Sequence, residues 1–320
     1  YIIPSTFDPR LISVIPAAVA NAAMDSGVAR IKIQDLELYK DQLTNRLDPT
    51  MSLMQGINAK VRKNPKRVIF AEGEDENMLK AAIEFGRNKL GTPILIGAEK
   101  RIKEQLKNIG LDENYKIEIV NSTDKEKREK YVQHLYKKLQ REGQLERDVD
   151  RLVRNERIAW GASMIACKDA DAMVTGNIRH YAASIEKLKK VTDPRPGEEI
   201  FGMTMITLKG KTIFVADTNV QDFPSPERLV KVSKSCVRVA RLFGFDPKVA
   251  FLSHSTFGKP ISKNTKHVRD AIELLKKDKV DFDFDGEMQP DVALNPIYQE
   301  IYPFSKIVGN ANILIMPALH

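Results

Sequence analysis

Cysteine and long apolar segments are scarce in this chain of 320 residues. The two cysteines, Cys167 and Cys236, stand in apolar segments without a CxxC pair or a Cys/His cluster nearby. This pattern predicts reduced, buried thiols in a cytoplasmic protein and excludes a structural zinc site. Apolar runs such as 93–96 and 313–316 fall far short of the roughly 18 residues that a membrane helix needs. We therefore expect no membrane partner.

Nucleotide-binding and hydrolase motifs are also missing. No GxGxxG follows any expected strand, and no GxSxG elbow occurs. The segment Gly210-Lys211-Thr212 ends like a P-loop, but Met205 stands where the first glycine of that motif belongs. The sequence thus carries no dinucleotide fingerprint and no P-loop. We expect no cofactor bound by this chain.

The N-terminus lacks the basic and apolar regions of a signal peptide. The chain opens on Tyr1 instead of methionine, which predicts a fragment of a longer polypeptide.

The net charge of +8 and the pI of about 9.2 raise the question of nucleic-acid binding. The basic residues, however, are interleaved with Glu and Asp, as in 125–130, which is typical of solvated helix faces. No basic stripe studded with aromatic residues is present, so we expect no nucleic-acid partner. A basic surface beside an anionic coenzyme explains the charge at least as well.

Strand-like and helical patterns alternate along most of the chain, which predicts an α/β fold with mainly parallel, doubly wound sheets. At this length we expect about two domains. Ser225 and Pro226 have the N-cap and first-position signals of a helix that Gly244 ends. The expected strands are 67–71, 92–96, 115–120, 171–175, 201–208, 211–216, 248–252 and 280–284, and the helical regions include 74–89, 100–108 and 123–166.

The composition changes near both ends of the first expected domain. Residues 16–24 predict an Ala-rich helix, and residues from 33 to about 54 predict a polar connector. Residues 192–197 contain two prolines and a glycine, which predicts a linker. We therefore expect a tail and linker in 1–54, a first subdomain in 55–195 and a second in 196–320. A hairpin is expected around Lys209-Gly210.

Two turns near the end of the chain carry the most informative chemistry. One is 252–258, after the strand-like run 248–252, and the other is 285–291, after 280–284. Ligands of open α/β sheets bind at the carboxyl ends of strands, and hydroxyls with backbone N–H groups there suit phosphate. The first turn is thus either a phosphate or pyrophosphate cradle or an ordinary hydrogen-bonded strand end. His254 cannot readily serve Ser253 or Ser255 as a base, because neighbouring strand residues point to opposite faces.

Carboxylates gather before and within the second turn. Asp281, Asp283 and Asp285 alternate with Phe282 and Phe284, which indicates a strand with one polar face. Such a cluster could hold a hard cation, but a half-exposed strand is the better interpretation, and we expect no metal. Asp285, Glu287 and Asp291 are the more credible functional carboxylates. Residues 72–75 are also acidic, and a structural role at a strand-to-helix turn explains them.

The segments together resemble the phosphate acetyltransferase (phosphotransacetylase) family from Arg67 to the C-terminus. The resemblance is carried by 71–75, 170–176, 253–258, 285–294 and 312–317. Residues 1–4, 7–11 and 22–29 look like the end of a bacterial malic enzyme domain. Joined in this order, the two parts resemble the C-terminal part of the hybrid NADP-dependent malic enzymes.

This resemblance implies two α/β subdomains of the isocitrate/isopropylmalate dehydrogenase type, with a cleft that binds acetyl-CoA or CoA. It also implies a homo-oligomer, and it places NADP and a divalent metal in a malic enzyme domain outside this chain. Ligand contacts are expected from these residues: Ser253, His254, Ser255, Thr256, Gly258, Gly286, Gln289, Thr175 and Gly176. The catalytic candidates are Asp285, Glu287, Asp291 and Arg179.

The chain departs from the transferase pattern where that family binds phosphate. Glu186 stands in place of one arginine, Leu139 in place of another, and Phe257 in place of the lysine of the Ser-Thr-Lys-Gly turn. Arg179 lies near the first of these positions but out of register. The family's last catalytic loop, with its Ser-Arg pair, would follow His320. Loss of guanidinium groups removes transition-state stabilisation of a phosphoryl group.

Three functions fit this pattern. The first is a regulatory and oligomerising domain of an NADP-dependent malic enzyme, which oxidatively decarboxylates malate to pyruvate, with acetyl-CoA as its allosteric effector and no catalysis of its own. The second is an active phosphate acetyltransferase in which Arg179 replaces the missing arginine. The third is a purely architectural dimerisation domain.

Overall fold

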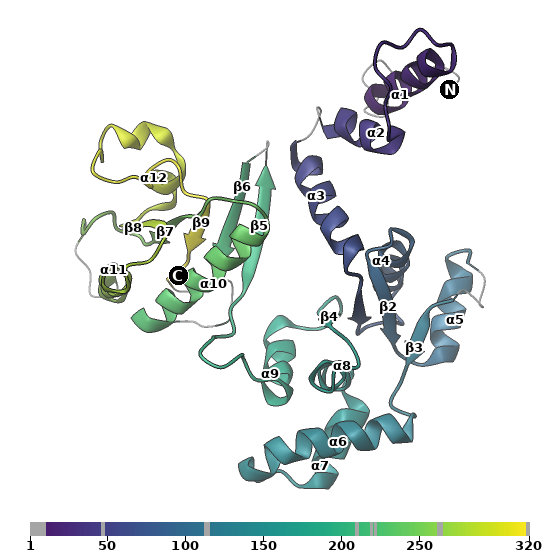
Figure 1. Ribbon diagram of the computed structural model, residues 1–320. Coiled ribbons are helices and arrows are strands. Elements are labelled where there is room, and N and C mark those ends of the chain that lie inside the picture. The colour runs from purple at the N-terminus through teal and green to yellow at the C-terminus, as the bar shows by residue number, and fades with distance from the viewer. Residues whose placement is uncertain are drawn as a thin grey trace. The chain divides into compact units, whose positions relative to one another are not determined.

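The computed structural model describes residues 11–45, 49–111, 116–208, 211–217, 220, 223–260 and 265–317 (Figure 1). The chain divides into two compact units. The middle unit is Asn58–Asp193, and the outer unit joins Tyr1–Ile57 to Pro194–His320. The chain passes from one to the other at Pro194, within the segment of prolines and glycine that the sequence predicts as a linker.

The middle unit contains a 4-stranded parallel sheet in the order β3-β2-β1-β4. Its strands are β1 (Lys66–Phe70), β2 (Gly91–Ile96), β3 (Glu118–Val120) and β4 (Ala172–Val174). Its helices are the C-terminal part of α3 (Pro49–Lys63), then α4 (Glu76–Arg87), α5 (Glu99–Asn108), α6 (Lys125–Leu139), η1 (Gln140–Glu142), α7 (Glu146–Asn155), α8 (Arg157–Ala166) and α9 (Tyr181–Val191). The strand order reverses between β1 and β4.

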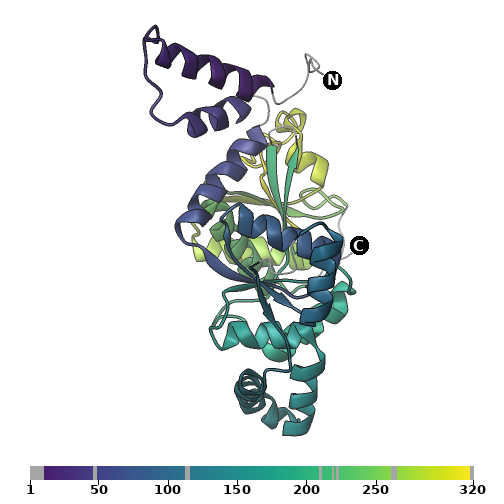
Figure 2. The same ribbon diagram turned by 90° about the vertical axis from the view of Figure 1, so that its right-hand side faces the viewer.

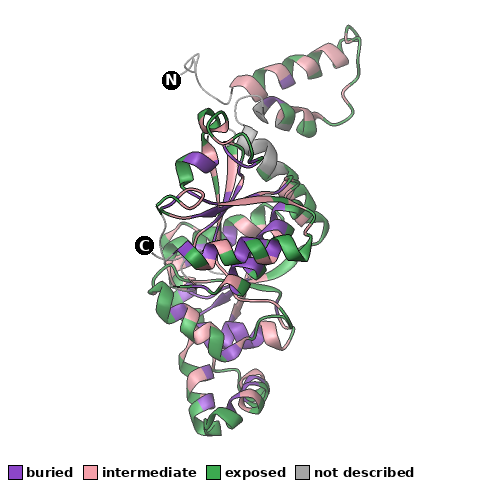
Figure 3. Cartoon of the chain, turned by 90° about the vertical axis from the view of Figure 1, so that its left-hand side faces the viewer, coloured by how far each residue is buried: buried purple, intermediate pink, exposed green. Residues whose placement is uncertain are grey.

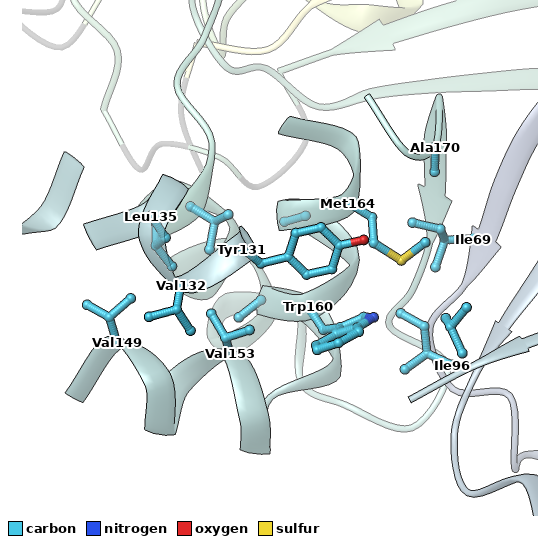
Figure 4. Close-up of a cluster of buried hydrophobic side chains, with 14 of the residues drawn as sticks. Ile69, Ile96, Tyr131, Val132, Leu135, Val149, Val153, Trp160, Met164 and Ala170 are labelled. Carbon is cyan, nitrogen blue, oxygen red and sulfur yellow. The ribbon is translucent and has the colours of Figure 1, made fainter. Parts of the chain in front are cut away.

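Alternate residues of these strands enter different hydrophobic cores, as expected for a sheet covered on both faces. Ile69 and Ile94 pack with buried residues of α6, α7 and α8, and Figure 4 shows this core around Tyr131 and Trp160. Phe70 and Leu95, the next residues along, pack instead with α4 and α5.

The outer unit contains a 5-stranded sheet in the order β5-β6-β9-β7-β8. Only the pairing of β5 (Met203–Leu208) with β6 (Lys211–Ala216) is antiparallel among its described strands, so the strands of the predicted hairpin are confirmed, while Lys209-Gly210 lies outside the described residues. The parallel strands are β7 (Lys248–Leu252), β8 (Asp283–Met288) and β9 (Ile313–Ile315). The helices after Pro194 are α10 (Pro226–Leu242), α11 (Lys266–Asp278), α12 (Pro290–Leu294) and η3 (Pro296–Gln299).

This sheet is also buried on both sides. Val249 and Phe251 join the core of α10 and α11, whereas Ala250 and Leu252 pack with α12 and the segment around Ile307. Buried and exposed positions alternate along the covering helices (Figure 3). The expected fold class, α/β with doubly wound parallel sheets, is therefore confirmed.

The N-terminal residues form more helix than the sequence predicts. The expected helix is α1 (Leu11–Asp25), and α2 (Leu36–Asn45) runs beside it in both views (Figures 1 and 2). The predicted polar connector is therefore wrong where it covers α2 and the start of α3. Polar composition conceals α2, but Asp35 accepts a hydrogen bond from the Leu38 N–H at 2.9 Å, and Leu43 is buried.

The region expected to be one helical stretch at 123–166 is divided into α6, η1, α7 and α8. Gly143, with φ of +80°, ends the first part, and Glu156 in extended backbone separates α7 from α8. The predicted N-cap Ser225 is confirmed, since its side chain accepts a hydrogen bond from the Arg228 N–H. No described helix has the length and apolar character needed to cross a membrane.

In the core of the middle unit, the buried Tyr131 makes a hydrogen bond through its hydroxyl. The side chain of Tyr131 is fully buried, and its ring meets that of Trp160 edge-on with 5.0 Å between centroids. The hydroxyl donates to Asp169 Oδ2 at 2.8 Å, and Lys130 Nζ lies 2.8 Å from both oxygens of Asp169. Burial and the Asp169 carboxylate raise the pKa of Tyr131, so it stays a neutral donor.

We expect Tyr131→Phe to lower the free energy of unfolding by about 1–3 kcal/mol, because the buried Tyr131 hydroxyl and its hydrogen bond to the half-buried Asp169 are lost. Urea unfolding followed by fluorescence measures this directly, since Trp160 is the only tryptophan of the chain and lies against Tyr131. Tyr136→Phe, on the same helix α6, is the matched control and should change stability much less. Equal losses in the two variants would contradict the role assigned to the hydroxyl.

Candidate functional site

The carboxyl ends of β7 and β8 lie side by side, because the two strands pair in parallel. The Ser253 N–H donates to the Met288 carbonyl at 3.0 Å, and the Gln289 side chain donates to the His254 carbonyl at 2.8 Å. Both informative turns of the sequence thus meet at one edge of the sheet, as the strand-end argument requires.

Strand β8 lies further along the chain than predicted. The sequence places it at 280–284, whereas it runs Asp283–Met288. Asp285 and Glu287 are therefore strand residues and not turn residues, and the turn starts at Gln289. Parallel pairing of Lys248 with Asp283 through Leu252 with Met288 decides this register, which local composition does not reveal.

Glu287 is the most constrained of the predicted residues. Its side chain is fully buried, and Oε1 accepts hydrogen bonds from the Ser255 hydroxyl at 2.7 Å, the Gly258 N–H at 3.1 Å and Arg269 Nη1 at 2.9 Å. Oε2 has no partner among the described residues. The carboxylate therefore holds the turn 253–258 against β8 and α11.

Most N–H groups of this turn donate hydrogen bonds within the protein. Ser255 N–H donates to the Ser253 hydroxyl, Phe257 N–H to the Glu287 carbonyl at 2.8 Å, and Thr256 N–H to the Lys259 carbonyl at 3.0 Å. A phosphate cradle needs such donors unpaired and pointing outward. These hydrogen bonds are those of an ordinary strand end, the alternative to a phosphate cradle that the sequence leaves open.

Glycine serves close packing at Gly286. Its φ is +147°, and a Cβ atom there would lie 2.6 Å from the Phe251 carbonyl oxygen on β7. The backbones of the two strands can approach here only without a side chain. Gly258, with φ of +86°, completes the turn after Phe257. Phe257 packs against Tyr302 and Phe304 with ring centroids 5.2 and 4.8 Å away.

The other carboxylates of this region have ordinary partners. Asp285 accepts from the Gly286 N–H at 2.9 Å, and a hydrogen bond to Asp291 raises the pKa of Tyr298. Asp281 is largely exposed, precedes the strand and pairs with Arg241 at 3.0 Å. The half-exposed strand is thus supported for Asp283 and Phe284, and no metal-ligand cluster occurs among the described residues.

Thr175 and Gly176 lie in the middle unit, where β4 ends beside β1. The Thr175 hydroxyl and the Gly176 N–H both donate to Glu72 Oε1, at 2.8 and 3.2 Å. Glu72 is 1% exposed, and its Oε2 has no partner among the described residues. This arrangement repeats that of Glu287: a buried glutamate at a strand end holds a hydroxyl and a glycine N–H of the neighbouring loop.

The remaining predicted residue, Arg179, is bound to an acid. Its Nη1 lies 3.1 Å from Glu156 Oε2, and Lys187 reaches the same oxygen at 2.6 Å. The predicted residues therefore form two groups, one at the carboxyl edge of each sheet. Their roles as ligand contacts or catalysts stay predictions.

Glu74, within the acidic segment 72–75, has the structural role that the sequence predicts, but its partners come from distant segments. It accepts the Ala98 N–H at 2.8 Å and pairs with Arg157 at 2.6 Å and Arg101 at 3.2 Å. Burial by itself raises the pKa of this carboxyl, but the Ala98 N–H and the two guanidinium groups outweigh it and lower the pKa. The structural role expected for 72–75 holds for Asp75 too, which caps α4 by accepting the Met78 N–H.

A family model described as phosphate acetyl/butaryl transferase matches residues 52–320. The chain belongs to this family. A phosphotransacetylase of Streptococcus pyogenes superposes with a TM-score of 0.74 at 26% identity, covering 84% of this chain and 82% of that one. The phosphate acetyltransferase of Clostridium acetobutylicum is 30% identical over 84% of this chain and 83% of its own length.

NADP-dependent malic enzymes match over the whole chain. The enzyme of Rhizobium meliloti is 45% identical over 100% of this chain but only 42% of its own length. That of Rickettsia prowazekii, named as probable, is 40% identical over 100% of this chain and 43% of its length. The chain thus spans under half of these relatives and matches their C-terminal portion.

We expect Glu287→Gln to destabilise the outer unit by about 1–3 kcal/mol, since a buried charged acceptor of several hydrogen bonds is lost. The amides of Phe257 and Gly258 should exchange with deuterium faster than in the unaltered protein. Glu273→Gln, which removes an exposed charge on the neighbouring helix α11, is the control. Unchanged exchange of the turn would show that Glu287 does not hold it.

The lowered pKa of Glu74 predicts a pH-dependent contribution to stability. The contribution is complete above the unfolded-state value of about 4.3 and is lost as the pH falls through the lower folded-state pKa. The difference in unfolding free energy between the unaltered protein and Glu74→Gln should thus be largest near pH 7 and shrink below about pH 4. Urea unfolding at several pH values measures it, with the exposed Glu76→Gln as control. A difference independent of pH would contradict this assignment.

Proposed function

We propose that the chain is the regulatory, oligomer-forming domain of an NADP-dependent malic enzyme, which converts malate to pyruvate, and that it binds acetyl-CoA without turning it over. The match of the whole chain to malic enzymes at 45% identity supports the first part. Membership of the phosphate acetyl/butaryl transferase family supports a site for acetyl-CoA or CoA. NADP and a divalent metal would then belong to the portion of those enzymes that this chain does not match.

The ion pair of Arg179 with Glu156 is the main support for a domain that does not catalyse acetyl transfer. Phosphoryl stabilisation needs a guanidinium group that is held for the substrate. Here Glu156 binds Arg179 at 3.1 Å. The positions at which the family resemblance calls for arginines hold Glu186, which is exposed and lies 3.6 Å from Lys190, and the buried Leu139. None of these side chains offers a substitute.

The predicted carboxylates support the same conclusion. Deprotonation of a thiol needs a base within reach of it. Glu287 is buried and engaged with the turn, and Asp285 accepts a backbone N–H of its own strand. A pocket built on this edge can still contact a coenzyme. Inhibition or activation by it would require tighter binding to one of two states of an assembly.

An active phosphate acetyltransferase is the second candidate. The Clostridium acetobutylicum enzyme favours it, because the alignment covers 83% of that enzyme. In this case Arg179 would have to leave Glu156 and contact phosphate. Glu156→Gln weakens the pairing and would then raise the turnover.

We expect no formation of acetyl-CoA from acetyl phosphate and CoA by the purified chain, and none by Glu156→Gln. The assay follows the thioester absorbance, with the Clostridium acetobutylicum enzyme as positive control. Turnover within about a hundredfold of that enzyme, equivalent to roughly 2.7 kcal/mol in activation free energy, would establish the second candidate instead.

Calorimetric titration with acetyl-CoA tests binding separately. We expect saturable heat, and sedimentation should show a homo-oligomer. Absence of heat together with a stable oligomer would support a purely architectural domain. A monomer that binds acetyl-CoA would keep the effector site and overturn the oligomerising role.

A further inference from the structure

The middle unit contains a cavity at the carboxyl ends of β2 and β3, and none of the predicted site residues lines it. Its volume is about 400 Å³. Its walls come from the turns that follow the two strands, from the start of α5, and from the junction of α7 with α8. Polar side chains at the end of β3, among them Ser122 and Thr123, face it together with the apolar Val153 and Trp160.

The charge at this cavity is positive. Lys100 and Arg154 line it, and neither pairs with a carboxylate among the described residues. The two acids of the lining are neutralised by cations outside it. Glu99 pairs with Lys103 at 2.7 Å, and Glu156 pairs with Lys187 and Arg179 as described above. Lys100 and Arg154 are therefore left without a counter-charge.

Two helices begin at the cavity, and the N-cap residue of neither one caps it with its own side chain, although Glu74 accepts the N–H of Ala98 at the start of α5. Ala98 is the N-cap of α5 and Glu156 that of α8, and neither side chain accepts from the helix. Both helices have 10 residues, and Glu99, Lys100 and Arg157 in their first turns line the cavity. The first N–H groups of a helix and its dipole favour a negatively charged ligand.

Trp160 adds an independent sign of a missing partner. It lines the cavity and is 1% exposed, yet its indole N–H has no hydrogen-bond acceptor among the described residues. Figure 4 shows the ring between Val153 and Ile96, which both line the cavity as well. A buried donor of this kind normally finds an acceptor.

We propose that this cavity binds a small organic molecule with a phosphate group. The phosphate lies at the start of α5 between Lys100 and Arg154, and the carbon part of the ligand lies against Val153 and Trp160. This site is separate from the turns at the end of β7 and β8. The proposal does not rest on the function proposed above, and either can fail alone.

Fluorescence of Trp160, the only tryptophan, reports occupancy of this site. The purified chain is titrated with ribose 5-phosphate, with inorganic phosphate and with ribose, all transparent at the excitation wavelength. We expect saturable changes with both phosphates, tighter for ribose 5-phosphate, and none with ribose. The double variant Lys100→Ala/Arg154→Ala should raise the dissociation constant at least about tenfold, because two charge-assisted contacts are lost.

The matched control is Lys107→Ala/Arg147→Ala. It removes the same charge from the same two helices, α5 and α7, at positions outside the cavity lining. Its dissociation constant should stay within about twofold of the unaltered protein, since distant exposed charges are screened. Equal weakening in both double variants would show attraction to net charge only and overturn the site. So would the absence of saturation with ribose 5-phosphate. Far-ultraviolet circular dichroism checks that each variant folds.

Discussion

One oxygen of a buried glutamate accepts hydrogen bonds from several segments at once, and this constraint organises the carboxyl edge of each sheet. In the outer unit Glu287 gathers a hydroxyl, a glycine N–H and Arg269 on one oxygen. In the middle unit Glu72 gathers the Thr175 hydroxyl and the Gly176 N–H. Burial of a charge is costly without such partners, so the loops after the neighbouring strands are held in the one geometry that supplies them.

The same constraint gives the two turns 252–258 and 285–291 a structural role. The serine, threonine and glycine residues at 253–258 are of the types that bind phosphate. Most of their N–H and hydroxyl groups, however, donate hydrogen bonds within the turn or to β8. Gly286 is required by the approach of two backbones, and Phe257 by an aromatic cluster with Tyr302 and Phe304. Hydrogen bonds within the protein therefore occupy most of the polar groups at this edge.

The distribution of ion pairs separates arginines and lysines that support structure from those that do not. Glu74 pairs with Arg157 and Arg101, and Glu156 pairs with Arg179 and Lys187. Lys100 and Arg154, which line the cavity at the ends of β2 and β3, pair with neither acid. Two basic side chains without a paired acid among the described residues therefore lie at the ends of β2 and β3. They are not at the reversal of strand order between β1 and β4, which is where ligands of open α/β sheets usually bind.

Periodicity and end signals in the sequence determined much of this protein. They identified the α/β class, the strand β7 at 248–252 and the Ser225–Pro226 helix start, because these depend on neighbouring residues. They did not predict α2, whose composition is polar. They also misplaced β8, whose residues Asp-Phe-Asp-Gly-Glu-Met alternate between charged and apolar types. Only pairing with β7 sets that register, and only Arg269, Ser255 and Gly258 make Glu287 tolerable in the interior. Tertiary structure decided these points because the partners of a buried charge come from segments distant in the chain.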